Sequence, residues 1–204
     1  MDLFANKIIP IVVIDDADDA RPLGEALVAA GLPIAEVLFR TDATAEAMAL
    51  MSEVEGLTVG AGTVLTPAQV ELAVEAGAQF LVSPGLRPDV VREARLAGKP
   101  IIPGAVTPGE VMHAQSLGLD TVNFFPAGMF GGSAGILALA SSFTATKFIV
   151  TGGVSAHNMA EYLTLDCVSA VGGSWMVPVE LIRVGDFNAI GELCRETAAL
   201  AATL

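Results

Sequence analysis

A carboxylate and a guanidinium lie four residues apart in the apolar segment Ile34–Arg40, which we expect to form a strand. On a strand, Glu36 and Arg40 would project from the same face, about 13 Å apart at ~3.3 Å per residue. Charged side chains are rarely buried unless they are paired. Glu36 could transfer protons, and Arg40 could hold a carboxylate through two parallel hydrogen bonds. The alternative is an internal ion-pair network without a catalytic role.

One polar side chain, Asn123, interrupts the apolar segment Asp120–Ala127, directly before Phe124 and Phe125. The segment is typical of a short buried strand that ends in a Pro-Ala turn. A buried amide without hydrogen-bond partners costs about 1–3 kcal/mol. We therefore expect Asn123 either to be hydrogen-bonded or to have a chemical role.

Small and hydroxyl-bearing residues follow most of the expected strands. Thr63 follows a glycine-rich strand end, and the last two strands are followed by the runs Thr151-Gly-Gly153 and Gly172-Gly-Ser174. Parallel barrels often hold phosphate at the ends of their last two strands, through backbone N–H groups and a helix N-terminus. The alternative is that glycine and proline only mark loops. The residues expected to hold an anion are Thr151, Gly152, Gly153 and Ser174.

Eight apolar, strand-like segments alternate with helix-like segments rich in Ala, Leu and Glu, and these elements must position the site. The pattern predicts one α/β domain over residues 1–204, a single (β/α)8 TIM barrel with its site at the C-terminal face of the strands. A doubly wound open sheet is the alternative. The expected strands are Ile8–Ile14, Ile34–Arg40, Leu57–Gly60, Phe80–Val82, Pro100–Pro103, Thr121–Phe125, Lys147–Thr151 and Cys167–Val171. The expected helices are Asp19–Ala30, Ala43–Val54, Pro67–Ala76, Pro88–Ala97, Pro108–Leu117, Ser133–Ser142, Ala156–Leu163 and Phe187–Ala202.

The formal net charge of -13, without a cluster of Lys or Arg, argues against nucleic acid and anionic membranes as partners. No apolar run approaches the roughly 18 residues needed to span a bilayer. The segment Met1–Lys7 lacks a basic start followed by an apolar run, so we expect no signal peptide and a cytoplasmic location. Two cysteines and two histidines, His113 and His157, are too dispersed for a metal site, and no cofactor is expected.

Several expected helices carry few charges on any face, among them the segments Ala43–Met51 and Gly135–Ala140. The outer helices of a barrel normally present a polar side to water. Apolar outer surfaces therefore favour contacts between subunits. The alternative is high helix propensity with scattered exposed apolar residues.

The ordered motifs resemble those of the 2-keto-3-deoxy-6-phosphogluconate (KDPG) / 4-hydroxy-2-oxoglutarate (KHG) aldolases, from about Ile9 to the last helix. The resemblance implies a trimeric barrel that cleaves a 2-keto acid into pyruvate and an aldehyde. It also implies that Glu36 is the general acid/base, that Arg40 and Thr63 hold the pyruvyl carboxylate, and that Gly152, Gly153 and Ser174 hold a phosphate. The motifs are Glu36-Val-Leu-Phe-Arg-Thr41, Gly60-Ala-Gly-Thr-Val-Leu65, Val82-Ser-Pro-Gly85, Pro103-Gly104, Asn123-Phe-Phe-Pro-Ala127, Thr151-Gly-Gly153 and Gly172-Gly-Ser-Trp175.

One position departs from the family pattern, which has a Schiff-base lysine where this chain has Asn123. A carboxamide nitrogen is not nucleophilic enough to attack a ketone. The three lysines, Lys7, Lys99 and Lys147, lie at or before the starts of expected strands, away from the C-terminal face. We therefore expect little or no class I aldolase activity from this chain.

Three interpretations remain open at this point. The first is an aldolase barrel that binds keto acids but lacks its nucleophile. The second is a catalytically silent symmetric trimer or larger assembly module. The third is a reaction that needs no Schiff base, such as enolisation by Glu36.

Overall fold

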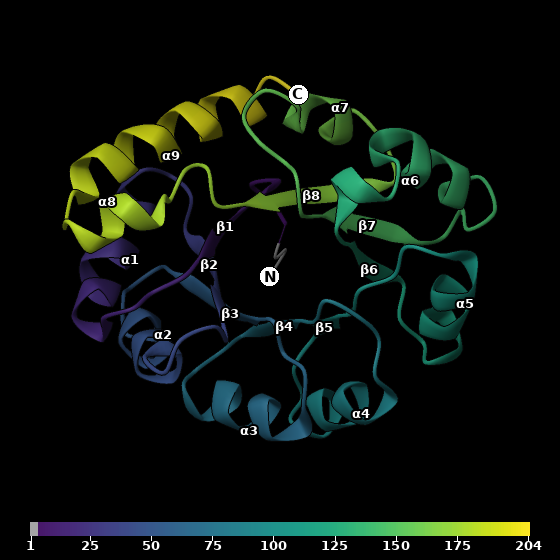
Figure 1. Ribbon diagram of the computed structural model, residues 1–204, viewed down its shortest axis with the longest axis horizontal. Helices are drawn as coiled ribbons and strands as arrows, with labels where there is room; N and C mark the ends of the chain where they lie inside the picture. The colour runs from purple at the N-terminus through teal and green to yellow at the C-terminus, as the bar shows by residue number, and fades with distance from the viewer. Residues whose placement is uncertain (1–3) are drawn as a thin grey trace.

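The computed structural model describes residues 4–204, which form a barrel of eight parallel strands surrounded by helices (Figure 1). Strands adjacent in sequence pair with one another, and β1 pairs with β8. A parallel bridge between Gly104 and Asn123 joins the β5 side to β6 and closes the ring. The predicted (β/α)8 fold is confirmed. The strands are β1 (Ile8–Val12), β2 (Ile34–Leu38), β3 (Thr58–Gly62), β4 (Phe80–Val82), β5 (Ile101–Ile102), β6 (Thr121–Phe124), β7 (Lys147–Val150) and β8 (Val168–Gly173).

The helices form an outer ring around the strands (Figure 1). They are α1 (Ala20–Ala29), α2 (Thr44–Ser52), α3 (Pro67–Glu75), α4 (Pro88–Leu96), α5 (Pro108–Ser116), α6 (Gly132–Ala140), α7 (Met159–Leu163), α8 (Val179–Arg183) and α9 (Phe187–Ala201). Two short 3-10 helices are η1 (Ala17–Asp19) and η2 (Ala127–Met129). Within residues 4–204, no helix combines the length and the apolar character needed to cross a membrane.

Residues 1–3 lie outside the described part of the chain. They include the start of the segment from which the absence of a signal peptide was predicted. They also include the first residues of the predicted 1–204 domain.

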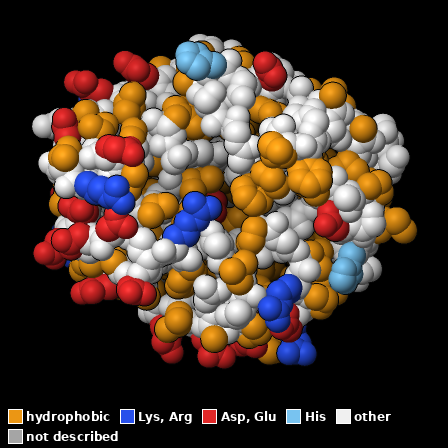
Figure 2. Space-filling model, viewed as in Figure 1, with side chains coloured by type: hydrophobic (Ala, Val, Ile, Leu, Met, Phe, Trp, Pro, Cys, Tyr) orange, Lys and Arg blue, Asp and Glu red, His pale blue; other side chains and the backbone are white. Residues whose placement is uncertain are grey.

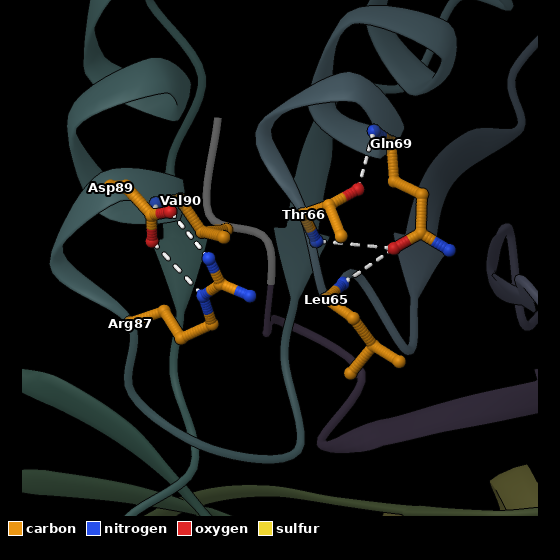
Figure 3. Close-up of polar contacts among 6 residues, drawn as sticks. All are labelled: Leu65, Thr66, Gln69, Arg87, Asp89 and Val90. Atoms are coloured by element: carbon orange, nitrogen blue, oxygen red, sulfur yellow. Dashed lines mark hydrogen bonds and ion pairs between the residues drawn. The ribbon is translucent and has the colours of Figure 1, made fainter.

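Side chains cap the starts of the helices after β3 and β5. At α3, Thr66 Oγ1 accepts from Gln69 N at 3.2 Å, while Gln69 Oε1 accepts from Thr66 N at 3.2 Å (Figure 3). This reciprocal pair satisfies N–H groups that an α-helix leaves unpaired at its start. Beside it, α4 begins at an ion pair between Arg87 and Asp89 (Figure 3), and α5 repeats the capping box of α3. These caps define the loops at the C-terminal ends of the strands.

Alternate residues of most strands contribute to two separate cores. Outward side chains pack against the helices, as where Phe124 and Phe148 meet edge to face with ring centroids 6.3 Å apart. Inward side chains fill the barrel with a second, smaller cluster. The site therefore lies above a packed floor. The buried residues of the inner cluster are Ile9, Ile34, Phe80, Val82, Ile102, Ile149 and Ala170.

The glycines after two predicted strands lie within the strands instead, because β3 continues to Gly62 and β8 to Gly173. Sequence analysis placed these strand ends at Gly60 and Val171. An added Cβ on Gly60 would lie 2.2 Å from the Phe80 ring. Glycine at this inward position therefore makes room for a large neighbour and does not mark a loop.

Two features of the last third of the chain also differ from prediction. Helix α7 begins at Met159 and not at Ala156, because Asn158 Oδ1 accepts from Ser155 N at 2.8 Å in a preceding turn. His157, which the predicted helix Ala156–Leu163 included, is exposed in that turn. Helix α8 was not predicted, since its five residues are too few for a periodic pattern.

Candidate active site

A cavity of about 300 Å³ opens among the inward residues near the C-terminal ends of the strands. Its lining combines acid, base and hydroxyl groups with glycine backbone and apolar side chains. The structure brings every predicted site residue to this one cavity. These residues are Glu36, Arg40, Thr63, Asn123, Thr151, Gly152, Gly153 and Ser174.

Glu36 is inward-facing on β2 and only 4% exposed. Its Oε2 atom is buried without a hydrogen-bond partner. Burial raises the pKa of Glu36 to about 7, against a smaller opposing effect of the Arg40 charge. A carboxyl group with a pKa near neutrality can both accept and release a proton, which is what an acid/base catalyst needs.

Gly62 leaves the space that the Glu36 carboxylate occupies. The two residues lie on neighbouring strands, and an added Cβ on Gly62 would lie 2.2 Å from Glu36 Oε1. The same Cβ would lie 2.3 Å from Leu38 Cδ2. Sequence analysis noted the glycine-rich segment but did not detect this steric role, which depends on the register of β2 and β3.

Arg40 lies after β2 and not within it, so the predicted strand Ile34–Arg40 is two residues too long. The chain turns because Leu38 O accepts from Arg40 N at 2.7 Å and from Thr44 Oγ1 at 2.9 Å. The Arg40 side chain is exposed, yet it lines the same cavity as Glu36. No ion pair found within residues 4–204 includes Glu36, which argues against an internal ion-pair network.

Asn123 is 3% exposed and lies on β6, opposite β2 in the ring of strands (Figure 1). Its Oδ1 accepts a hydrogen bond of 2.7 Å from Thr151 Oγ1. Asn123 is therefore hydrogen-bonded, the first of the two expected alternatives. Because the amide oxygen is engaged, the amide nitrogen, which can only donate, is the group left for a ligand in the cavity.

Thr63 adopts a left-handed backbone conformation with φ of 57°. This region is a genuine outlier for a β-branched residue. Thr63 follows directly after Gly62 at the end of β3 and lines the cavity. Strained residues of this kind persist where the surroundings hold them, and they cluster at functional sites.

The opposite side of the cavity is built from backbone and hydroxyl groups. Gly152 and Gly153 both have positive φ, and an added Cβ on Gly152 would lie 2.9 Å from Pro126 Cα. Asn158 Nδ2 donates to Gly153 O at 2.9 Å and anchors this turn. Ser174 follows β8 next to it and also lines the cavity.

Phe125 also lines the cavity, and sequence analysis gave it no role. The signal was present, because a residue two positions after Asn123 points to the same face of an extended chain.

Within residues 4–204, no group of three or more His, Cys, Asp or Glu side chains is placed to hold a metal ion.

No lysine is among the residues that line the cavity. Lys7 precedes β1, Lys99 precedes β5, and Lys147 is the first residue of β7. Lys147 is exposed, and its Nζ donates to Asp166 O at 2.9 Å. All three amines therefore lie toward the N-terminal ends of the strands, as the sequence indicated.

Comparison with known proteins gives the family. The sequence model described as KDPG and KHG aldolase matches residues 2–193. The 2-dehydro-3-deoxy-phosphogluconate aldolase of Treponema pallidum (strain Nichols) is 45% identical over 192 residues, which are 94% of this chain and 91% of that relative. The chain belongs to the KDPG and KHG aldolase family. The resemblance noted from its motifs is confirmed.

Solved structures of KDPG aldolases share this barrel. That of Zymomonas mobilis ZM4 with 3-phosphoglycerate has a TM-score of 0.92 and 39% identity, covering 97% of this chain and 94% of that one. That of Legionella pneumophila, with pyruvate captured at low pH as a covalent carbinolamine intermediate, has a TM-score of 0.92 and 38% identity, covering 96% of each chain. The aldolase fold thus spans almost the whole chain.

Proposed function

We propose that this chain is a single-domain barrel of the KDPG and KHG aldolase family that binds 2-keto acids such as pyruvate or phosphorylated sugar acids. Glu36 is its general acid/base. Arg40 and Thr63 hold the carboxylate of the keto acid, and Gly152, Gly153 and Ser174 hold the phosphate end beside Thr151. The observation that carries this proposal is a single cavity in which a buried carboxyl group, a guanidinium and a glycine–hydroxyl cradle face one another.

The chemistry of the cavity supports this division of roles. Arg40 is the one cationic residue among those that line it, and a guanidinium matches the two oxygens of a carboxylate. Gly152 and Gly153 lack side chains and allow backbone groups to approach a phosphate closely. The Legionella relative described with pyruvate and the Zymomonas relative described with 3-phosphoglycerate support a ligand with both kinds of group.

We also propose that this chain does not form the Schiff base of class I aldolases. The motif resemblance supports this proposal, because the family pattern has its nucleophilic lysine where this chain has Asn123, and an amide cannot form an imine with a ketone. The lysines at positions 7, 99 and 147 do not line the cavity. Aldol cleavage through an iminium is therefore lost or very slow in this chain, while binding of the keto acid is retained.

Borohydride trapping tests this proposal. The chain and its Asn123→Lys variant are incubated with pyruvate, reduced with borohydride and weighed by mass spectrometry. We expect an adduct of pyruvate mass only on Asn123→Lys, together with pyruvate release from KDPG in a coupled assay. An adduct on the unaltered chain would overturn the loss of the Schiff base. An Asn123→Lys variant that folds but forms no adduct would count against an intact site.

A second candidate is a catalytically silent homotrimer or larger assembly, and an exposed apolar surface favours it. Met129, Phe130 and Leu137, which we call the α6 surface, are 83%, 46% and 51% exposed. Figure 2 shows hydrophobic side chains gathered over η2 and the start of α6, while acidic side chains gather on the opposite side of the same face. We propose that the α6 surface contacts another copy of this chain. We also propose a cytoplasmic location for this chain.

A further inference from the structure

We infer that this cavity enolises a bound 2-keto acid without a covalent intermediate: Glu36 removes a proton from C3, and the Asn123 amide donates to the keto oxygen. The inference rests on the proposed function, since it requires a pyruvyl group to occupy the cavity. It adds an activity that needs no lysine. It also gives the residue at position 123 a catalytic role of its own.

The proposed base is Glu36, whose Oε2 atom is not engaged in a hydrogen bond. Glu36 is almost completely buried, and its Oε2 has no hydrogen-bond partner, although buried polar atoms usually have one. Glu36 is among the residues that line the cavity, so its carboxyl group adjoins a ligand bound there. The carboxylate lies close to Gly62, where an added Cβ would come within 2.2 Å of Oε1. A carboxylate with an oxygen free of hydrogen bonds, on a residue that lines a cavity, can accept a proton from a bound ligand.

The proposed hydrogen-bond donor to the keto oxygen is the Asn123 amide on β6, across the ring of strands from Glu36. β2 and β6 lie on opposite sides of the ring of eight strands (Figure 1), and Glu36 and Asn123 both line the cavity. The Thr151 hydroxyl holds the amide oxygen at 2.7 Å and so leaves the NH₂ group to donate. A hydrogen-bond donor aimed at a developing oxyanion in a dry site is worth about 10²–10³ in rate.

The proton and the electrons balance without another reactant. The C3–H bond breaks, and its electron pair becomes the C2=C3 double bond of the enolate. The π pair of the ketone moves to oxygen, where the Asn123 N–H groups stabilise the charge. Glu36 carries the proton and exchanges it with water at the open mouth of the cavity. Reversal of the same steps returns the keto acid with a hydrogen from solvent at C3.

Thr151 is a positioning residue in this scheme, because it acts through Asn123. Removing its hydroxyl frees the amide to rotate, so that its oxygen can face the enolate oxygen and repel it. Thr151→Val removes the hydrogen bond at nearly constant volume, whereas Thr151→Ser keeps it. The two variants form a matched pair.

Loss of the pyruvate methyl signal in D₂O, followed by proton NMR, measures the activity. We expect exchange by the unaltered chain, a fall of about 100-fold or more in Glu36→Gln, and a fall of about 10-fold in Thr151→Val. Thr151→Ser should restore most of the exchange that Thr151→Val loses, and the surface control Lys147→Gln should leave exchange unchanged. Treatment with pyruvate and borohydride should leave the rate unchanged. Inactivation by that treatment would overturn the inference, because it would reveal a covalent imine.

Binding of pyruvate, measured by saturation-transfer NMR, separates the two proposals. Bound pyruvate with an exchange rate no higher than that of Glu36→Gln would overturn enolisation and leave the keto acid site standing. Absence of pyruvate binding by the unaltered chain would overturn both. Bound pyruvate with exchange that depends on Glu36 and on the Thr151 hydroxyl would support both.

Discussion

The carboxylate of Glu36 occupies space that exists only because residue 62 has no side chain. An added Cβ on Gly62 would lie 2.2 Å from Glu36 Oε1, closer than real Cβ contacts come. Glu36 lies on β2 and Gly62 on β3, and the register of these strands brings the two together. The position of the proposed base therefore depends on the absence of a side chain at residue 62.

Gly62→Ala should displace the Glu36 carboxylate and reduce deuterium exchange into pyruvate by about 10- to 100-fold, because misplacing a catalytic group by about 1 Å is that costly. The fold should survive, with a loss of about 1–3 kcal/mol for overpacking. NMR exchange rates and urea unfolding measure the two effects.

The matched control for that variant is Gly109→Ala on α5, where an added Cβ meets nothing within 4 Å. This variant should keep its exchange rate and gain up to about 1 kcal/mol of stability from helix propensity. Equal exchange rates in Gly62→Ala and the unaltered chain would contradict the dependence of Glu36 on Gly62.

Stability should fall as the pH rises from about 4.5 to about 7, through Glu36. Its pKa in the folded protein is about 7, above its ordinary value of 4.5. Between these values the folded state keeps a proton that the unfolded state releases, so raising the pH favours unfolding. Arg40 is the other charged residue that lines the cavity, and its charge lowers the pKa and limits the effect.

The contribution of Glu36 should reach roughly 3 kcal/mol over this range, at about 1.4 kcal/mol for each pH unit between the two pKa values. Glu36→Gln cannot titrate and should lose this part of the pH dependence. Urea unfolding of both proteins at pH 5 and pH 8 measures this contribution. It is the change in the free energy of unfolding between the two pH values, compared between the unaltered chain and Glu36→Gln. The same pH dependence in both proteins would show that Glu36 is ionised at its ordinary pKa.

Thr63→Gly should be more stable than Thr63→Ala by about 1 kcal/mol. Residue 63 has φ of 57°, and strain of roughly 1–3 kcal/mol is relieved by glycine but not by alanine. The greater freedom of glycine in the unfolded chain offsets roughly 0.5–1 kcal/mol of that gain. Both variants lack the hydroxyl and should bind pyruvate more weakly than Thr63→Ser. Urea unfolding and pyruvate titration measure these effects, and a less stable glycine variant would argue against strain.

Leu137→Glu should reduce the particle mass from three copies to one if the α6 surface joins subunits. A charge placed in a buried apolar contact is strongly unfavourable. Leu96→Glu on α4 is the control, since Leu96 is 75% exposed and lies outside the α6 surface. Light scattering of both variants and the unaltered chain measures the mass. A parent particle much larger than a trimer would favour the assembly function, and a monomeric parent would exclude the α6 surface as a subunit contact.

The order of strands and helices could be predicted from the chain, and so could eight of the residues that line the cavity. Period-two alternation predicted that Glu36 and Arg40 share one face, and the residues after successive parallel strands meet at one face of a barrel. The family motif also led us to propose a departure at Asn123, because a motif fixes what its positions ordinarily contain. These features depend on local patterns and on the order of motifs along the chain.

The ends of strands and the short helices were harder to predict from the sequence. Arg40 was assigned to β2, but the Thr44 hydroxyl and the Arg40 N–H both bond to Leu38 O and end the strand earlier. Gly62 was placed after the predicted strand Leu57–Gly60, although it continues β3 where a neighbour needs its space. In each case the deciding partner belongs to a turn or a strand whose register no local pattern specifies.

The printed residues were thus sufficient to predict a barrel, the face of the candidate site and a nucleophile proposed to be absent. The folded chain added the unpartnered oxygen of Glu36, its pKa near neutrality and the bond from Thr151 to Asn123. Thr151 and Asn123 are 28 positions apart and meet only because β6 and β7 pair in one register. Burial and hydrogen bonding depend on such distances through space, which the linear order of residues does not contain.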